Sequence, residues 1–100
     1  MLIRIVRMHF KEGNERDFLK IFDLHKISIR NFPGCSQLQL LKDINDPLCL
    51  TTLSHWHAKE NLENYRQSEL FSIVWKKVKP LFSKKTEAFS FEEIETILGS

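Results

Sequence analysis

The first strand-like segment of the sequence, Leu2–Phe10, has apolar side chains on both of its faces. Successive side chains of a β-strand point to opposite sides of the sheet, so odd and even positions form separate sets. One side receives four apolar residues and the other receives two, namely Leu2, Val6, Met8 and Phe10 against Ile3 and Ile5. A strand with this pattern lies inside a sheet or is covered on both faces. The rest of the chain must therefore supply neighbouring strands and a cover for each face.

A helix and then a β-hairpin follow this strand. The helix is predicted to run from Asn14, which can cap it, to Asn31. Phe32-Pro33-Gly34 stops the helix, because proline cannot continue it and glycine permits the turn. Strands are predicted over Cys35–Lys42 and Leu48–Trp56, on either side of a polar loop. Their register stays open, since a slip of one residue exchanges the two faces of a strand.

Two helical segments and a fourth strand complete the predicted order. A short helix is expected over Ala58–Gln67, with a capped restart at Ser68 and a stronger helix over Leu70–Phe82 that Pro80 kinks or ends. Lys85–Phe91 is predicted as the last strand. The order βαββαβ indicates an α+β, ferredoxin-like fold, a four-stranded antiparallel sheet with its helices on one face. We expect residues 1–91 to form this domain and residues 92–100 to form a C-terminal tail, which contains at most a turn of helix.

Helices on one face leave the opposite face of the predicted sheet uncovered. The first strand nevertheless has apolar residues on both faces, and a bare apolar sheet face is an association surface. We therefore expect the chain to form a homodimer through that face.

Length, charge and hydropathy exclude several other kinds of partner. The chain has 100 residues, which suits one domain, and its formal net charge of +2 is too small to indicate binding to nucleic acid or to an anionic membrane. RNA-binding domains of the same element order stack bases on rings of their third strand, where this chain has Leu50-Thr51-Thr52-Leu53. No apolar run approaches the ~20 residues that a membrane span requires.

The two cysteines indicate a reducing compartment. Cys35 and Cys49 fall at opposite ends of the predicted hairpin, roughly 20 Å apart, whereas a disulfide needs Cα atoms within about 7 Å. Free thiols and an N-terminal segment unlike a signal peptide together predict a cytoplasmic protein.

The junction between the third strand and the following helix gathers several polar aromatic side chains. His55-Trp56-His57 ends the strand, and Tyr65 and Arg66 follow on the helix. Strand alternation puts both histidines opposite the indole. A His-x-His pair can bind a metal, but no third ligand stands at a telling spacing, so no metal site is predicted. Arg66 points about 100° away from Tyr65 and is expected to be a solvated or dimer-rim charge.

The third predicted strand ends on Trp56, and the helical region after it contains Tyr65 and Ser68, followed by Glu69-Leu70-Phe71. Gly34 lies between the first helix and the second strand. With these residues in this order, the sequence resembles the antibiotic biosynthesis monooxygenase (ABM) superfamily of dimeric α/β barrels. The likeness covers residues 1–91. It implies a homodimer in which two sheets face each other, with one pocket per protomer between the sheet and its own helices. It also implies a range of activities, among them cofactor-free oxygenation of polyphenols, oxidative haem degradation and isomerase-like chemistry. The fold alone does not choose among them.

Two positions depart from the haem-degrading branch of this superfamily. Val6 stands where that branch has an Asn, and Trp75 stands where it has a haem-ligating His. Haem binding of that type is therefore not expected, and no cofactor is assigned. The missing Asn also removes a polar group that the polyphenol oxygenases are expected to use to steady a substrate anion.

The candidate site residues come from this resemblance and from helical spacing. Trp56 is expected to form a flat pocket wall with its N–H as a donor, or else to pack the helix onto the sheet. Tyr65 is a candidate hydrogen-bond donor or acid, and His25, within an apolar helical stripe, is a candidate base or a satisfied core histidine. The substrate-binding set is predicted to be Trp56, Trp75, Val6 and Phe22.

Two functions remain open from the sequence. One is a cofactor-independent ABM-type monooxygenase that acts on a small planar or enolisable molecule. The other is a non-catalytic dimeric module of the same fold that binds a small ligand or has a structural role. The missing strand Asn favours the second, and the Trp56/Tyr65 pair favours the first.

Overall fold

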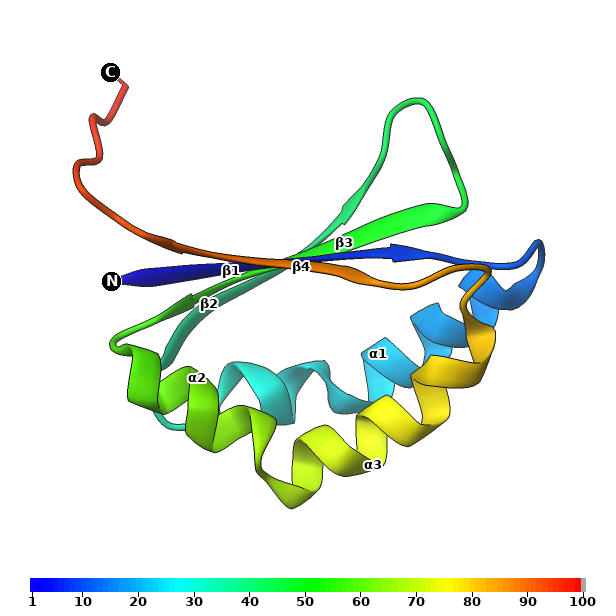
Figure 1. Cartoon of the computed structure of the whole chain (residues 1–100), viewed down its shortest axis with the longest axis horizontal. Helices are drawn as coiled ribbons and strands as arrows, with labels where there is room; N and C mark the ends of the chain where they lie inside the picture. Colours follow the sequence, from blue (N-terminus) through cyan, green and yellow to red (C-terminus); the bar gives the residue numbers. More distant parts are fainter. Residues whose placement is uncertain (100) are drawn as a thin grey trace.

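The computed structural model describes residues 1–99 and contains one antiparallel sheet with all of its helices on the same side (Figure 1). The elements in chain order are β1 (Leu2–His9), α1 (Asn14–Arg30), β2 (Cys35–Lys42), β3 (Cys49–Trp56), α2 (Lys59–Arg66), α3 (Glu69–Val78), the 3-10 turn η1 (Lys79–Leu81) and β4 (Glu87–Glu92). This arrangement confirms the ferredoxin-like fold, with the last helical region split into α2 and α3. None of the described helices is both long and apolar enough to span a membrane.

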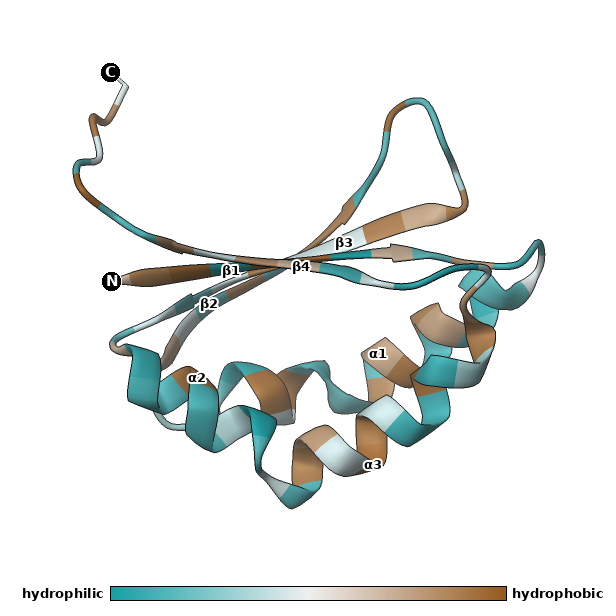
Figure 2. Cartoon of the chain, in the orientation of Figure 1, coloured by the Kyte–Doolittle hydropathy of each residue, from teal (hydrophilic) through white to brown (hydrophobic). Residues whose placement is uncertain are grey.

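The strand order β2-β3-β1-β4 puts β1 inside the sheet, as its two apolar faces require. The register, which the sequence leaves open, pairs Val6 of β1 with Thr52 of β3 and with Ala88 of β4. Even-numbered residues of β1 therefore face the helices, together with the even-numbered residues of β3, of β4 and of β2 after Gln37. A register shift between Cys35 and Gln37 puts Cys35 opposite Trp56, on the same side. Figure 2 shows the apolar residues of α1 and α3 recurring between polar ones, as an amphipathic helix on a sheet requires.

The start of α1 differs from the prediction that Asn14 caps it. Gly13 occupies the capping position in the left-handed region, with φ of 91°, and no side-chain cap is formed. Asn14 is the first helical residue, and its Nδ2 donates to the backbone oxygen of Leu81 at 3.3 Å. The Glu15 carboxylate instead accepts the Gly13 N–H at 3.1 Å. Asn14 therefore ties the helix start to η1 rather than capping the helix.

The break between α2 and α3 follows the predicted restart at Ser68. The Ser68 hydroxyl accepts the backbone N–H of Phe71 at 3.1 Å, which satisfies one of the free donors of the new helix. α3 ends at Val78, and Pro80 lies in the 3-10 turn that follows. The two short helices can therefore bend around the sheet, which one straight helix could not do.

Gly34 joins α1 to β2 where the backbone passes directly against α2. Its φ is +90°, and a Cβ atom at this position would lie 2.3 Å from the side chain of Asn61. Its carbonyl accepts the N–H of His57 at 2.8 Å. Glycine is required here both for its conformation and for the close approach, which holds the start of α2 against the end of β3.

The core lies between the sheet and the helices and consists of two clusters. Met8, Phe10, Phe18, Leu50 and Val78 form the first, towards the α1 start and the η1 turn. Cys35, Trp56 and Leu62 form the second, at the opposite end of the sheet. Both cysteines have free thiols, as predicted, and both are buried.

The other side of the sheet lacks a helical layer. Figure 1 shows the β2–β3 loop and the C-terminal segment after β4 extending on that side, away from the helices. Large apolar side chains are exposed there, with Leu41, Phe89 and Phe91 at 42%, 45% and 52% of their full surface. We call this surface, together with Ile3, Ile5 and Leu53 of the same face, the open face. β4 ends at Glu92, and Ser100 at the end of the predicted tail lies outside the described residues.

Candidate functional site

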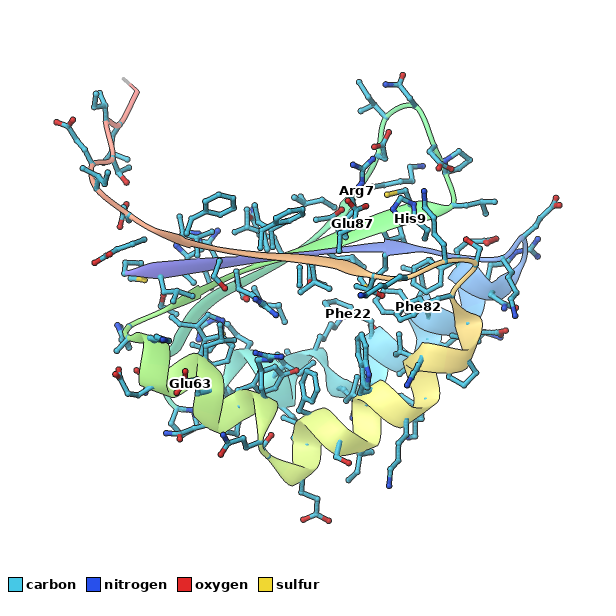
Figure 3. The ribbon with its side chains drawn as sticks, viewed as in Figure 1. Arg7, His9, Phe22, Glu63, Phe82 and Glu87 are labelled. Atoms are coloured by element: carbon cyan, nitrogen blue, oxygen red, sulfur yellow. The ribbon has the colours of Figure 1, made fainter. Side chains whose placement is uncertain are left out.

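A cavity of about 340 Å³ lies between the two core clusters, under the sheet and above the helices. Its size is at the lower end of the range of small-molecule sites in proteins. Most of the lining side chains are apolar, and they come from the helix-facing side of the sheet and from all three helices. The sheet forms its roof and α1, α2 and α3 form its floor. Figure 3 shows Phe22 of α1 in this space between the helices and the sheet.

An unbroken series of aromatic contacts forms one wall of the cavity. Ring centroids lie 5.2 Å apart for Trp56–Tyr65, 5.3 Å for Tyr65–Phe71 and 5.7 Å for Phe71–Trp75. The first and last of these pairs are stacked and the middle one is edge-to-face, geometries that aromatic quadrupoles favour. The wall is therefore rigid, apolar and suited to a flat ligand.

Trp56 is more deeply engaged than the sequence suggested. Only 1% of its surface is exposed, and its indole N–H donates to the Ser54 hydroxyl at 2.9 Å. Tyr65 stacks against its ring. The indole N–H is therefore not free for a ligand, and Trp56 acts on the site mainly by holding Tyr65 in place.

Tyr65 lies inside the cavity as a neutral phenol. Burial, with a smaller contribution from the nearby Cys35 thiol, raises its pKa to about 12. At neutral pH the hydroxyl therefore keeps its proton and can donate a hydrogen bond or a proton. It cannot serve as a base in that range.

Two arginines are the charged residues among the cavity lining. Arg4 projects from the helix-facing side of β1, and Arg66 comes from the last turn of α2. Burial and repulsion from Arg66 both lower the pKa of Arg4. The Arg4 Nη1 donates to the Ser90 hydroxyl at 2.8 Å.

Five of the six predicted site residues line this one cavity, namely Val6, Phe22, Trp56, Tyr65 and Trp75. His25 does not line it. The His25 Nε2 instead lies 3.4 Å from the Nζ of Lys77 on α3, at an exposed contact between the two helices. The apolar stripe of α1, to which His25 was assigned, faces α3 as well as the sheet. His25 lies on the side of that stripe that faces α3.

Arg4 and Thr86 are cavity residues that the sequence did not reveal. Arg66, expected to be a solvated or dimer-rim charge, is exposed, and it lines the cavity as well. A signal for Arg4 exists, because it alternates onto the same strand face as Val6. That signal could be used only once it was known that Val6 faces the helices, because the register of the strand decides which face each residue occupies. Thr86 precedes β4 and gives no comparable pattern.

The open face has polar contacts of a different kind. Arg7 Nη2 lies 3.4 Å from the Asp43 carboxylate, and its Nε donates to the Cys49 sulfur at 3.3 Å. His9 Nε2 lies 3.0 Å from the Glu87 carboxylate. Figure 3 shows Arg7, His9 and Glu87 together on the side of the sheet away from the helices. Within residues 1–99, no group of three or more His, Cys, Asp or Glu side chains is arranged to hold a metal ion.

Solved structures with the same fold are numerous at low sequence identity. A protein from Deinococcus radiodurans, described as a candidate antibiotic biosynthesis monooxygenase, matches with a TM-score of 0.89 at 14% identity, covering 100% of this chain and 99% of that one. One from Bordetella bronchiseptica with the same description matches at 0.83 and 21% identity, covering 94% and 97%. A conserved protein from Methanosarcina mazei Go1 matches at 0.87 and 19% identity, covering 93% of each chain. No curated protein gives a significant sequence match.

The sequence itself matches the family model for antibiotic biosynthesis monooxygenases over residues 1–74. This match spans β1 to the middle of α3, and so includes Trp56, Tyr65 and all of the cavity lining except Trp75, Val78, Thr86 and Ala88. The resemblance inferred from Trp56, Tyr65 and Ser68 is thereby confirmed. The chain belongs to the antibiotic biosynthesis monooxygenase family.

Proposed function

We propose that the protein is an ABM-type monooxygenase that acts, without a cofactor, on a small planar or enolisable molecule bound in the cavity. The observation that supports this most strongly is the combination of an aromatic wall with a neutral, buried phenol at Tyr65. The wall suits a flat substrate by stacking, and the phenol suits an oxygen atom on which negative charge develops.

The substrate supplies the electrons in this proposal. A doubly activated CH₂ group ionises to a carbanion or enolate, which reduces O₂ and forms a carbon–oxygen bond. Loss of water from the resulting peroxide leaves a carbonyl, so that R₂CH₂ and O₂ give R₂C=O and H₂O. The chain's own contribution is to exclude water, to orient the flat molecule and to donate a hydrogen bond from Tyr65 to the ionised oxygen.

The cavity lining favours substrates that ionise without help. Its titratable side chains are Arg4, Tyr65 and Arg66, and none of them is a base near neutral pH. The substrate must therefore enter as an anion or lose its proton to water. Readily ionised 1,3-dicarbonyls and quinols satisfy this condition.

We also propose that the protein works as a cytoplasmic homodimer joined through the open face. The exposed Leu41, Phe89 and Phe91 on a sheet without a second layer support this arrangement. The free thiols of Cys35 and Cys49 support a reducing compartment. The domain then comprises residues 1–91 with a short C-terminal tail.

A non-catalytic ligand-binding module on the same fold is the second candidate. It is favoured by Val6 and by the position of His25, since the cavity has neither a strand Asn nor a histidine base. Such a module would bind the same flat molecules and release them unchanged.

Oxygen consumption with a panel of quinols and 1,3-dicarbonyls separates the two candidates. The enzyme consumes O₂ in step with carbonyl product, and Tyr65→Phe lowers kcat by about tenfold or more, because it removes one donor to the developing charge. The control Ile73→Ala, at an exposed position on α3, keeps the wild-type rate. Saturable binding of the panel without O₂ uptake above the buffer rate would replace the enzyme with the binding module.

A further inference from the structure

The two arginines of the cavity have no carboxylate partner. Neither Arg4 nor Arg66 takes part in any ion pair within residues 1–99, where the five pairs present involve other residues. Carboxylates do stand nearby. Glu63 lies one turn before Arg66 but is 3.9 Å from Lys59, and Glu92 shares the strand face of Arg4 without pairing with it. Two positive charges therefore meet at this site without a compensating negative one.

Holding these arginines together is unfavourable in the empty protein. The only contributions that shift the pKa of Arg4 are burial and Arg66, and both lower it. A guanidinium that is partly desolvated beside a second one is stabilised when an anion lies between them. The two arginines are therefore cations that lack, among the described residues, the anion needed to complete an ion pair.

Arg66 lies at the mouth of the cavity that Arg4 also lines. Arg66 and Phe71 line the cavity and also line a shallow outer depression completed by Glu63 and Gln67. Arg66 thus stands where the interior opens to the surface, and Arg4 lines the same cavity. Repulsion from Arg66 also contributes to the lowered pKa of Arg4. A molecule that fills the cavity would leave its end beside both.

Thr86 supplies a second, independent sign of an absent ligand. Its hydroxyl is buried, lines the same cavity and has no hydrogen-bond partner among the described residues. A buried hydroxyl without a partner costs free energy, so native proteins seldom leave one unless a ligand or water completes it.

We propose that the cavity selects planar organic anions, whose apolar body lies along the aromatic wall and whose carboxylate or enolate oxygens bind between Arg4 and Arg66. This inference rests on the proposed function, for which it names the substrate class. Guanidinium groups suit it because each offers several N–H donors in one plane and stays charged at any physiological pH. Arg4 keeps further donors after its bond to Ser90.

Binding of matched probes tests this without relying on oxygen chemistry. 2-Naphthoate and 2-naphthamide share their ring system and differ in charge, and 2-acetylindane-1,3-dione presents an enolate in place of a carboxylate. Isothermal titration at pH 7.5 is expected to give naphthoate at least about tenfold tighter binding than naphthamide, the usual strength of a charge-assisted contact. Tight binding of the dione as well would show that the oxyanion, and not the carboxylate group in particular, is recognised.

Substitutions assign the effect to the arginines. Arg4→Gln and Arg66→Gln are each expected to lower naphthoate affinity about tenfold while changing naphthamide affinity less than about twofold. Arg16→Gln is the charge-matched control, since Arg16 is 80% exposed on α1 and lies outside the cavity lining. In the empty protein, Arg66→Gln should leave the free energy of unfolding unchanged or raise it, because it relieves repulsion. An arginine with a structural role would lower it.

The outcomes separate this inference from the function on which it rests. Equal binding of naphthoate and naphthamide would overturn the choice of anions and leave the cavity as a ligand site. Binding of neither probe would overturn both. Arginine-dependent binding of naphthoate and the dione without O₂ consumption would support the anion site and remove the monooxygenase.

Discussion

β1 presents alternate side chains to the two faces of the sheet, and the charged residues of these two sets differ in their partners. On the open face, Arg7 pairs with Asp43 and His9 pairs with Glu87. On the helix-covered face, Arg4 is repelled by Arg66 and has no carboxylate partner among the described residues. The covered face also holds a cavity, whereas the open face exposes flat apolar rings. On the open face, the polar side chains are paired and the apolar surface is exposed. On the helix-covered face, the apolar surface is buried and Arg4 has no carboxylate partner within residues 1–99.

This difference indicates two kinds of missing partner. A bare apolar surface with internally paired charges suits a second protein chain, because only apolar contacts remain to be made. A closed apolar space with an unpaired charge at its mouth suits a small charged ligand. In the proposals made above, one face of the sheet serves assembly and the other serves ligand binding.

The largest effect is expected from the packed side of the sheet. Phe10→Ala removes a ring that is 1% exposed and lies 4.9 Å from Phe18 and 5.4 Å from Phe82 between centroids. The free energy of unfolding should fall by about 3–5 kcal/mol, as for other large-to-small core substitutions. Urea unfolding of Phe10→Ala beside Leu24→Ala, whose side chain is 76% exposed on the outside of α1, measures it. Similar losses for both variants would show that the first core cluster is not close-packed.

The open face should control assembly instead. Phe89→Asp places a charge on that face and is expected to weaken dimer formation by about 2–4 kcal/mol, because the carboxylate must be desolvated at the centre of the contact. Sedimentation velocity should show a folded monomer. Ile73→Asp, at a position on α3 that is 42% exposed against 45% for Phe89, should remain a dimer. A wild-type monomer at micromolar concentration would remove the comparison altogether.

Tyr65 reports the covered face directly, because it is the one tyrosine in the sequence. Absorbance at 295 nm during a pH titration should show ionisation at a pH of about 12 in the folded protein, and near 10 after unfolding in urea. The pKa is raised on folding, so the associated stability is fully present below pH 10 and is lost as pH rises from 10 through 12. A midpoint near 10 in the native protein would place the phenol in water and outside a dry cavity.

The smallest effect is expected at the His9–Glu87 pair of the open face. The hydrogen bond from His9 lowers the pKa of Glu87 below its ordinary value of 4.5. Its contribution to stability is therefore present above that value and is lost as pH falls through the lowered pKa. Glu87→Gln should be slightly less stable than wild type at pH 6–7, with the difference vanishing in acid. Thermal unfolding from pH 3 to 7 measures it, and a gap that widens in acid would have the wrong sign.

Much of the fold follows from local patterns in the sequence. Alternation in β1, the Phe32-Pro33-Gly34 stop and the Ser68 restart each depend on neighbouring residues, and each holds in the structure. The predicted cap of α1 does not hold, because Gly13, in the left-handed conformation, occupies the capping position that was predicted for Asn14. The choice between two adjacent capping residues depends on tertiary contacts such as the bond from Asn14 to Leu81.

The site was harder to predict from the sequence, because it depends on the strand register and on which neighbour the apolar stripe of each helix faces. Arg4 could not be assigned to a face until β1 was aligned with β3 and β4. His25 follows the spacing of Phe18 and Phe22, yet α1 packs on both the sheet and α3, so an apolar stripe does not say which neighbour each residue meets. Trp56 and Tyr65 were found because they belong to a family pattern, but the hydrogen bond from the indole to Ser54 has no signature in the sequence.

The assignment of ligand binding to the covered face can be measured at individual side chains of both faces at once. The chain has two tryptophans, Trp56 and Trp75, and both line the cavity, whereas Gln37 and Gln39 lie on the open face. In a ¹H–¹⁵N spectrum titrated with 2-naphthoate, the two indole N–H peaks should shift with one shared dissociation constant while the side-chain peaks of Gln37 and Gln39 stay in place. Stationary indole peaks, or Gln37 and Gln39 peaks that move in their stead, would contradict a ligand site between the sheet and its helices.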